Sequence, residues 1–338
     1  MPNRYGRRQK FVWRPKKKDP AGAPSTAPPP PPPPWVELPR DLTANILQRL
    51  GVEDVLRNAI MVCTTWRNVC KDPTMWRVIN MSKPSFSDDD ELEDMCRHAV
   101  ELSQGELNEI IIEDFCTNEL LLYIAQRSSK LKKLRLVSCY CVSNDCLSKA
   151  AIQLPLLQDI QIYFCSLSVE FIKTAGRSCP LLKSFTYNKD GCRDELVCDE
   201  EAVAVAEHMK GLHHLSLFGS NMTNKGLRAI VDGCPHLKSL DMRRCFNVAP
   251  EADLLEKCSK QIKDLKYPYD SMSDYEFSDY VEAYDELQYS MGFSDEGYDF
   301  DDEYDEYFDY DDYTDSFSHE YFEHFDDLYP NVPPEWFM

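Results

Sequence analysis

The chain has 338 residues and a formal net charge of −21, from 37 Lys and Arg against 58 Asp and Glu. The charge is unevenly distributed: residues 1–34 carry +7, residues 267–338 carry −24 without any Lys or Arg, and residues 35–266 carry only −4. No apolar run approaches the ~20 residues of a membrane helix, and the basic start lacks the apolar stretch of a signal peptide. We therefore expect a near-neutral body with two oppositely charged ends, and cysteines that are mostly reduced thiols.

Residues 1–34 form a basic arm that ends in seven consecutive prolines at 28–34. A proline run is stiff and fits neither a helix nor a sheet, so we predict a disordered arm. Two interpretations stay open. In the first, the arm has a function, as a nuclear-import signal followed by a spacer or as a ligand for proline-binding modules. In the second, it is a solvated extension with no specific role. We expect a nuclear and/or cytoplasmic protein.

Residues 35–80 are predicted to form a small helical module. Leu42, Ile46, Leu47 and Leu50 follow the spacing of one helix face. The segment also holds three tryptophans, yet forty-odd residues bury too little surface to be very stable alone. We therefore expect part of its apolar surface to be covered by the next domain or by another protein.

The order of the apolar anchors in this module resembles an F-box over about 40 residues. The matching positions are Leu38-Pro39, Asp41-Leu42, Ile46-Leu47, Leu50, Val55, Val62-Cys63, Trp66-Arg67 and Trp76, with Thr65 where the family commonly has Lys. The resemblance implies a three-helix fold that docks on a Skp-type adaptor. It assigns adaptor contacts to Leu38, Pro39, Leu42, Ile46, Leu47 and Val55, and the packing of the helices to Trp66 and Trp76.

A self-similar pattern begins at residue 107, after a predicted linker helix at 81–106. Apolar anchors recur at intervals of 24 to 30 residues, and each is followed by an alternating apolar pair. The period indicates leucine-rich repeats, and the alternation indicates short strands with one buried face. Ser143, Ser168 and Thr223 are predicted caps of the helices that follow. The seven anchors are Leu107, Leu131, Leu157, Leu182, Leu212, Leu237 and Ile262.

Cysteines recur three residues after several of the alternating pairs, at Cys139, Cys165 and Cys245. A small thiol suits the inside of the turn that leaves a strand. The pattern resembles the cysteine-containing subclass of leucine-rich repeats in plant F-box proteins. The expected fold is an α/β repeat: a three-helix F-box joined to a short arc over 107–267. The arc would have about six repeats and a degenerate seventh, with parallel strands inside and helices outside.

Side chains that alternate with the buried strand residues are expected on the concave face of this arc. Taken singly, each could be an ordinary solvated sheet position; taken together, they indicate a binding surface. The proposed substrate-binding residues are Lys133, Arg135, Tyr163, Phe218, Asp241 and Arg243.

Residues 268–338 form an acidic, aromatic tail that we predict to be disordered, because like charges at this density oppose compaction. Three interpretations stay open: the tail binds a basic partner, folds back on the basic arm, or only aids solubility. Its charge argues against direct nucleic-acid binding.

The sequence contains no recognisable catalytic motif, and its closely spaced cysteines lack the spacing of metal ligands. We expect a non-catalytic protein without cofactor or metal, and without a membrane or nucleic-acid partner. The resemblance implies the substrate-recognition subunit of a Skp–cullin–F-box ubiquitin ligase. Its partners would be a Skp-type adaptor, through it the cullin and RING subunits, and a protein substrate. The alternative is a ligase-independent scaffold whose acidic tail binds basic nuclear proteins.

Overall fold

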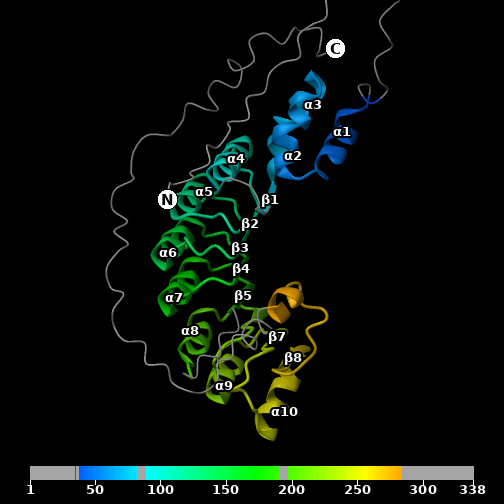
Figure 1. Ribbon diagram of the computed structural model, residues 1–338. Coiled ribbons are helices and arrows are strands. Elements are labelled where there is room, and N and C mark those ends of the chain that lie inside the picture. Colours follow the sequence, from blue (N-terminus) through cyan, green and yellow to red (C-terminus); the bar gives the residue numbers. More distant parts are fainter. Residues whose placement is uncertain (1–34, 36–37, 83–88, 190–196, 284–338) are drawn as a thin grey trace, which may run out of the picture. The chain divides into compact units, whose positions relative to one another are not determined.

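The computed structural model describes Trp35 and residues 38–82, 89–189 and 197–283 (Figure 1). Residues 38–338 form one compact unit, distinct from residues 1–37, and the description below concerns that unit. The predictions made for the basic arm and for residues 284–338 of the tail lie outside the described residues.

The unit begins with a module of short helices. Leu47, Val55 and Val69 lie in its core, because apolar residues spaced by three and four gather on the inner faces of the helices. An ion pair of 2.6 Å joins Arg40 at the start of the first helix to Asp72 before the final turn. The helices are α1 (Arg40–Leu47), α2 (Val52–Arg57) and α3 (Thr64–Cys70), with 3₁₀ turns at Ala59–Met61 and Pro73–Trp76.

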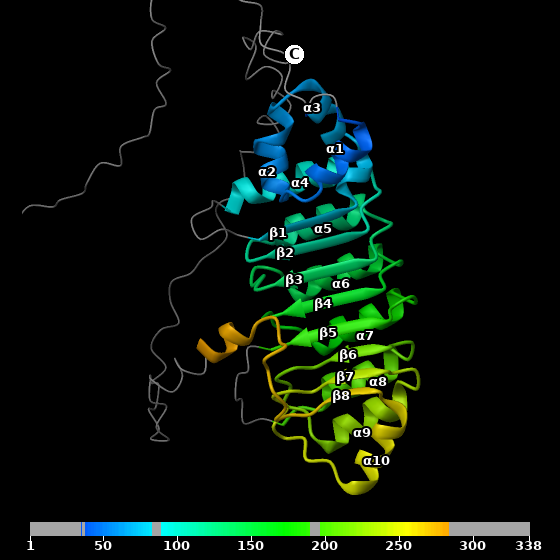
Figure 2. The same ribbon diagram turned by 90° about the vertical axis from the view of Figure 1, so that its right-hand side faces the viewer.

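Eight parallel strands follow, and each pairs with the next one in the chain to form a single sheet (Figure 2). Strands β1 to β5 each bury two alternating apolar side chains, β6 and β7 each bury one, and all seven predicted anchors are buried. The predicted α/β repeat fold is thereby confirmed. The strands are β1 (Val78–Ser82), β2 (Glu109–Glu113), β3 (Lys133–Val137), β4 (Asp159–Tyr163), β5 (Ser184–Asn188), β6 (His214–Ser216), β7 (Ser239–Asp241) and β8 (Asp264–Lys266).

One helix follows each strand from β1 to β7, and all these helices cover the same face of the sheet (Figures 1 and 2). The predicted caps are confirmed: the side chains of Ser143, Ser168 and Thr223 accept hydrogen bonds from backbone N–H groups in the first turns of their helices. The opposite face, here called the open face, carries no helix of this series. The helices are α4 (Asp89–Leu102), α5 (Asn118–Arg127), α6 (Asn144–Gln153), α7 (Val169–Ser178), α8 (Glu200–His208), α9 (Asn224–Gly233) and α10 (Ala252–Gln261).

The sheet begins before residue 107, the predicted start of the repeats: β1 overlaps the end of the module predicted at 35–80, and α4 lies within the linker helix predicted at 81–106. Strand β1 pairs in register with β2, and α4 is the first of the outer helices. Trp76 takes the anchor position of this unit, three residues before the buried Ile79. The unit escaped the sequence pattern because its anchor is a tryptophan and lies 31 residues before Leu107, outside the regular period.

In five of the repeats, the residue at which the chain turns away from the strand has a left-handed backbone. Its amide nitrogen donates to the next repeat, as from Ser138 to the carbonyl of Tyr163 at 3.0 Å. This conformation favours glycine, yet only one of the five residues is a glycine. The five are Asp114 (φ 74°), Ser138 (φ 52°), Phe164 (φ 54°), Gly219 (φ 70°) and Arg244 (φ 62°).

The predicted disorder of the tail is wrong for residues 268–283, because this segment packs against the open face of the sheet. It crosses beside the carboxyl ends of the central strands, where both views place it in orange (Figures 1 and 2). Tyr275 and Val281 are buried there, and Met272 and Phe277 pack in the same clusters. Burial of its aromatic groups holds an acidic segment that charge alone would leave solvated. Residues 270–283 are called the C-terminal segment below.

Candidate protein-binding surfaces

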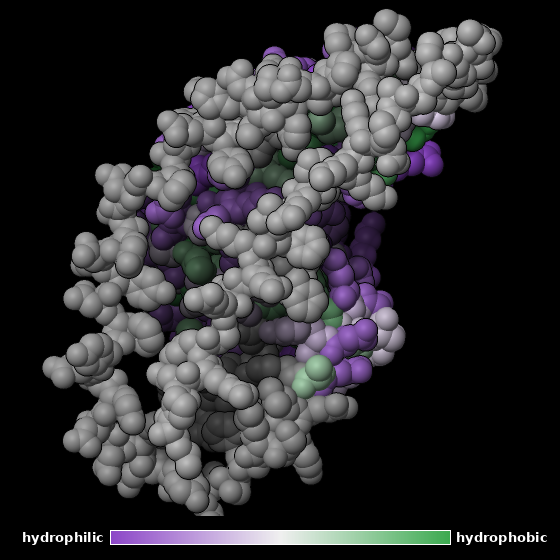
Figure 3. Space-filling model, turned by 45° about the horizontal axis from the view of Figure 1, so that its top comes forward, coloured by the Kyte–Doolittle hydropathy of each residue, from purple (hydrophilic) through white to green (hydrophobic). Residues whose placement is uncertain are grey.

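Helix α1 presents an apolar surface to solvent. Leu42 is 51% exposed and Ile46 is 46% exposed, one helical turn apart, and Leu50 is exposed just after the helix. The coloured surface in Figure 3 is largely hydrophilic, with small and scattered hydrophobic patches. An aligned set of large exposed aliphatic side chains is the pattern of a surface that another protein covers.

A hollow of about 660 Å³ adjoins this surface, between the end of α1 and the first strand. Leu50, Met75 and Val78 are among the residues that line it. Leu50 and Val78 are exposed beside it, so the apolar surface of α1 continues onto the first repeat.

The predicted adaptor contacts divide into exposed and buried positions. Pro39, Leu42 and Ile46 are exposed and Leu38 is half-buried, so all four can reach a partner. Leu47 and Val55 are buried in the module's own core. The assignment of direct contacts to these two residues is corrected: their side chains hold the helices that carry the exposed surface.

The two tryptophans assigned to the module's packing lie in different surroundings. Trp76 is buried, and its indole N–H donates to the carbonyl of Cys70 at 2.7 Å. Trp66 is partly buried and packs against the main core. Trp76 also begins the first repeat, so it joins the module to the sheet as well as closing the module.

The open face presents the six predicted substrate-binding residues in rows across the sheet. Strand register places Val137, Tyr163 and Asn188 side by side, at the carboxyl ends of β3, β4 and β5. Phe218 and Arg243 follow the ends of β6 and β7. These five residues form what we call the carboxyl-end row. Lys133 begins β3, Arg135 lies in its middle, and Asp241 is the last residue of β7, two residues before Arg243.

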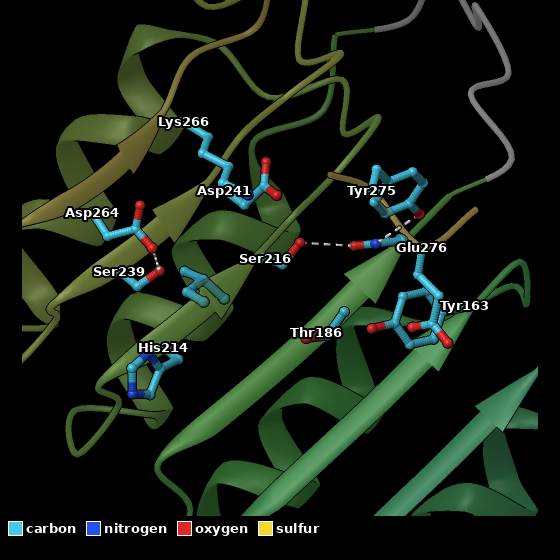
Figure 4. Close-up of a pocket in the computed structure, with 12 residues that line it drawn as sticks. Tyr163, Thr186, His214, Ser216, Ser239, Asp241, Asp264, Lys266, Tyr275 and Glu276 are labelled. Carbon is cyan, nitrogen blue, oxygen red and sulfur yellow. Dashed lines mark hydrogen bonds between the residues drawn. The ribbon is translucent and has the colours of Figure 1, made fainter. Parts of the chain in front are cut away.

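Tyr275 is the central contact of the C-terminal segment with this row. Its ring stacks on Phe218 with a centroid distance of 4.3 Å and an interplanar angle of 8°. Its hydroxyl accepts a hydrogen bond of 2.9 Å from the amide of Asn188, which in turn accepts one of 3.0 Å from Ser216 (Figure 4). Burial raises the pKa of the Tyr275 hydroxyl, so the ring is held in its neutral form.

Acidic residues on both sides of Tyr275 pair with basic residues of the open face. Asp274 accepts a hydrogen bond of 2.7 Å from Arg243 and a second one from Lys266. The hydrogen bond from Lys266 is the main cause that lowers the pKa of Asp274. Glu276 pairs with Arg135 at 2.6 Å. The charges of the segment and of the face are therefore complementary.

Phe277 completes the contact two residues after Tyr275. Its ring centroid lies 5.0 Å from that of Tyr163 and 5.1 Å from that of Phe164. The guanidinium of Arg135 lies over the rings of both Tyr163, at 4.7 Å, and Phe277, at 5.6 Å. This arrangement is a cation–π contact added to the aromatic cluster.

The C-terminal segment changes the accessibility of the predicted substrate-binding residues. Phe218 is 0% exposed and Arg243 is 2% exposed, and Tyr163 is buried as well. The expectation that these three side chains are exposed is wrong, because residues of the same chain cover them. Lys133, Arg135 and Asp241 stay partly accessible.

A cavity of about 280 Å³ remains beside the segment (Figure 4). Its walls come from the open face and from Tyr275 and Glu276 of the segment. Among the groups drawn, Ser239 donates to Asp264 at 3.1 Å, at the end away from Tyr275. The cavity is polar, and it shows that the segment fills the open face incompletely.

Two contacts of this site were missed by reasoning from the sequence. Phe164 directly follows a strand, where its left-handed backbone turns the ring toward the segment. Asn188 pairs with Tyr275, a residue 87 positions away in the chain, and no local pattern indicates this contact. The available signal for the segment was the run Tyr275-Glu276-Phe277 itself, in which aromatic residues interrupt the acidic ones.

In the described part of the chain, no three His, Cys, Asp or Glu side chains are grouped so that they could hold a metal ion. None of the helices in those residues is long and apolar enough to cross a membrane.

Comparisons with known proteins show which family the chain resembles. The F-box-like family model matches residues 35–82. F-box/LRR-repeat protein 23 of Arabidopsis thaliana is 45% identical over 257 residues, which are 73% of this chain and 56% of that protein. F-box protein SKIP19 of the same plant is 45% identical over 242 residues, which are 71% of this chain and 79% of that protein. The chain thus spans a little over half the length of the first relative and most of the second.

Two solved structures show a distant likeness. A Bacteroides fragilis protein aligns with a TM-score of 0.39 and 11% identity, over 69% of this chain and 73% of that one. A chain of the yeast Rad7 and Elc1 complex aligns with a TM-score of 0.37 and 13% identity, over 64% and 65%. Likenesses this low carry no argument about function.

A helical module with an exposed apolar helix, joined to repeated strand–helix units in one parallel sheet, is the architecture of an F-box followed by leucine-rich repeats. The chain belongs to the F-box/LRR-repeat family. Members of this family are generally non-catalytic adaptors: the F-box binds a Skp-type protein, and the repeats recruit a substrate for ubiquitination.

Proposed function

We propose that this chain is the substrate-recognition subunit of a Skp–cullin–F-box ubiquitin ligase, acting in the nucleus or the cytoplasm. The exposed apolar face of α1 binds the Skp-type adaptor, which connects the chain to the cullin and RING subunits. The open face of the repeats binds the protein to be ubiquitinated.

The observation that carries the proposal is the exposure of Leu42 and Ile46 beside the buried Leu47 on the same helix. Their exposure leaves apolar area in water, and burying one such side chain is worth about 1.5–3 kcal/mol. The buried neighbour fixes the orientation of the helix. A helix held this way is suited to pack into an apolar groove of a partner.

The test is co-precipitation of the full chain with a Skp-type adaptor. Leu42→Ala with Ile46→Ala should weaken binding at least about tenfold, because about 1.4 kcal/mol of lost burial corresponds to that factor. Leu38→Ala with Pro39→Ala tests the chain that enters the helix and should also weaken binding.

Ile152→Ala is the matched control, because Ile152 is an aliphatic residue on the outer helix α6 that is at least as exposed as Leu42 and Ile46. It should leave adaptor binding unchanged. Full binding by the Leu42 and Ile46 double variant would disprove the assigned surface. Failure of the unaltered chain to bind any Skp-type adaptor would disprove the proposed function.

A further inference from the structure

The carboxyl-end row carries the side-chain types that dominate protein-binding sites, yet the chain covers it with its own C-terminal segment. Tyr163, Phe218 and Arg243 of the row, and Arg135 beside it on β3, are of the aromatic and arginine types that act as hot spots. All four contact the segment. Arg135 forms an ion pair with it, Tyr163 packs in an aromatic cluster with it, Phe218 stacks on a ring of it, and the buried guanidinium of Arg243 pairs with one of its carboxylates. The occupant therefore shows what chemistry this site accepts.

We propose that the carboxyl-end row is a binding site for acidic aromatic peptide segments of a partner protein, and that the C-terminal segment occupies it as an internal competitor. The ligand has the order acidic–Tyr–acidic–Phe, as in Asp274-Tyr275-Glu276-Phe277. If the chain is a ligase subunit as proposed above, this peptide is the recognition element of the substrate; that last step alone rests on the proposed function.

Each position of this order has a separate receptor on the open face. The tyrosine stacks on Phe218 and accepts from Asn188. The acidic residue before it pairs with Arg243, whose guanidinium is buried and also held by Asp241. The acidic residue after it pairs with Arg135, on the other side of the stacked ring. A basic segment would meet two arginines here and be repelled.

The receptor for the phenylalanine shows that the site is adapted to an occupant. Phe164 adopts a left-handed backbone, with φ of 54°, which is costly for a bulky residue. The equivalent positions of other repeats hold Asp, Ser, Gly and Arg. The ring of Phe164 packs on Tyr163, Phe277 and Tyr280. An aromatic residue at this strained position is accounted for by the contact it makes with the bound segment.

Part of the contact between the segment and the open face is solvated, so a partner can compete with the segment for this site. The carboxylates of Asp274 and Glu276 are more than half exposed, although the arginines that they pair with are largely buried, so water and salt reach these ion pairs from the side of the segment. Phe277 is only partly buried, and a polar cavity remains beside Tyr275. The segment follows β8 through an exposed loop at Tyr269. A tethered occupant of this kind benefits from a high effective concentration rather than from intrinsic affinity.

The experiment places a sequence-specific protease site between Tyr269 and Asp270 of the full chain. The folded protein is cleaved and then mixed with a fluorescein-labelled peptide of residues 270–283. Fluorescence anisotropy should show saturable binding to the cleaved chain and none to the intact one. A peptide in which Tyr275 and Phe277 are replaced by Ala should not bind.

Arg135→Ala in the cleavable chain should weaken peptide binding by about tenfold, a loss typical of an interface hot spot. Arg228→Ala is its control, because Arg228 forms an exposed ion pair with Asp253 away from the open face. It should bind the peptide like the unaltered chain.

A second variant removes the need for cleavage. Tyr275→Ala with Phe277→Ala in the intact chain should detach the segment and allow the labelled peptide to bind. Tyr269→Ala should leave the segment in place and the peptide unbound. Adaptor co-precipitation is measured on the same samples, so failure of the proposed function appears there and is independent of the peptide result.

Two results would overturn the proposal. In the first, neither the cleaved chain nor the Tyr275 and Phe277 variant binds the peptide. In the second, release of the segment unfolds the repeats, as read by far-ultraviolet circular dichroism. Either outcome would make the segment a permanent part of the fold.

Discussion

Cysteine side chains of the repeats lie inside the turns that leave the strands, where their sulfur atoms contact backbone carbonyl groups. The Sγ atom of Cys139 lies 3.2 Å from the carbonyl oxygen of Val137, and that of Cys245 lies 3.0 Å from the carbonyl oxygen of Leu217. Burial raises the pKa of Cys245 to about 12. A thiol in this state has almost no thiolate at neutral pH and is chemically inert.

Thiol reactivity provides a test at the scale of single residues. Cys141 is exposed, whereas burial raises the pKa of Cys179 and Cys234 to about 11. At pH 7.5, iodoacetamide should therefore label Cys141 well before these two cysteines, as followed by peptide mass spectrometry. Urea should remove the difference. Equal labelling rates in the folded protein would contradict the burial described here.

At the scale of elements, neighbouring repeats are joined through the first residues of their helices as well as through the sheet. The side chain of Asn118 accepts from the backbone N–H of Ser143 at 2.8 Å, and Asn144 accepts from Ser168 at 2.7 Å. Each helix therefore helps to fix the start of the next one. These hydrogen bonds add to the continuous sheet and the shared core, which join the units into one body.

The close packing of α9 against α8 depends on Gly233. A Cβ atom added to Gly233 would lie 2.5 Å from the carbonyl oxygen of Ala206. Gly233→Ala should therefore lower the free energy of unfolding by about 1–3 kcal/mol, although alanine normally stabilises a helix. Urea denaturation measures the change.

Gly211→Ala is the control for this change, because its added Cβ would meet nothing closer than 3.5 Å, the carbonyl oxygen of Leu182. Its stability should change little. If Gly233→Ala were as stable as the unaltered chain, α8 and α9 would not be packed as closely as the structure shows.

At the scale of the whole molecule, the acidic C-terminal segment and the open face are held together partly by charge. The pKa of Asp274 is lowered in the folded protein, chiefly by its hydrogen bond from Lys266. A carboxylate of this kind stabilises the folded state above its unfolded pKa of about 3.9, and the contribution is lost as the pH falls through the lowered value. The raised pKa of Tyr275 sets the limit at alkaline pH. The neutral tyrosine stabilises the folded state fully below about pH 10, and this stabilisation is lost as the pH rises.

Retention of the segment should follow this pH dependence. In the chain cleaved after Tyr269, the released fraction of fragment 270–338 should be equal at pH 7 and pH 5 and greater near pH 3. Gel filtration measures the released fraction, and circular dichroism verifies that the repeats stay folded. Asp274→Asn should raise release at pH 7 and reduce the change between pH 5 and pH 3.

The exposed Asp279, hydrogen-bonded only to Ser278 among its described contacts, supplies the control. Asp279→Asn should release the fragment like the unaltered chain at each pH. If Asp274→Asn showed an unchanged pH dependence, the ion pairs with Arg243 and Lys266 would not hold the segment.

Local patterns were sufficient to predict the repeats and the helical module. The apolar anchors, the alternating strand pairs and the caps at Ser143, Ser168 and Thr223 each depend on residues within one unit. The first repeat was missed because Trp76 replaces the usual leucine. The sequence predicted only in part which residues of α1 are buried, because the same apolar spacing includes both the exposed Leu42 and the buried Leu47.

By itself, the sequence determined the family, the fold class, the parallel strand order and the positions that face away from the helices. These features follow from short-range spacing that repeats along the chain. Only the tertiary structure decided what covers the open face. The stack of Tyr275 on Phe218 and the pairing of Glu276 with Arg135 join residues far apart in the chain, across a sheet that exists only after folding. Composition predicted that an acidic segment stays in solvent, and the aromatic and basic groups gathered by the sheet reverse that balance for residues 270–283.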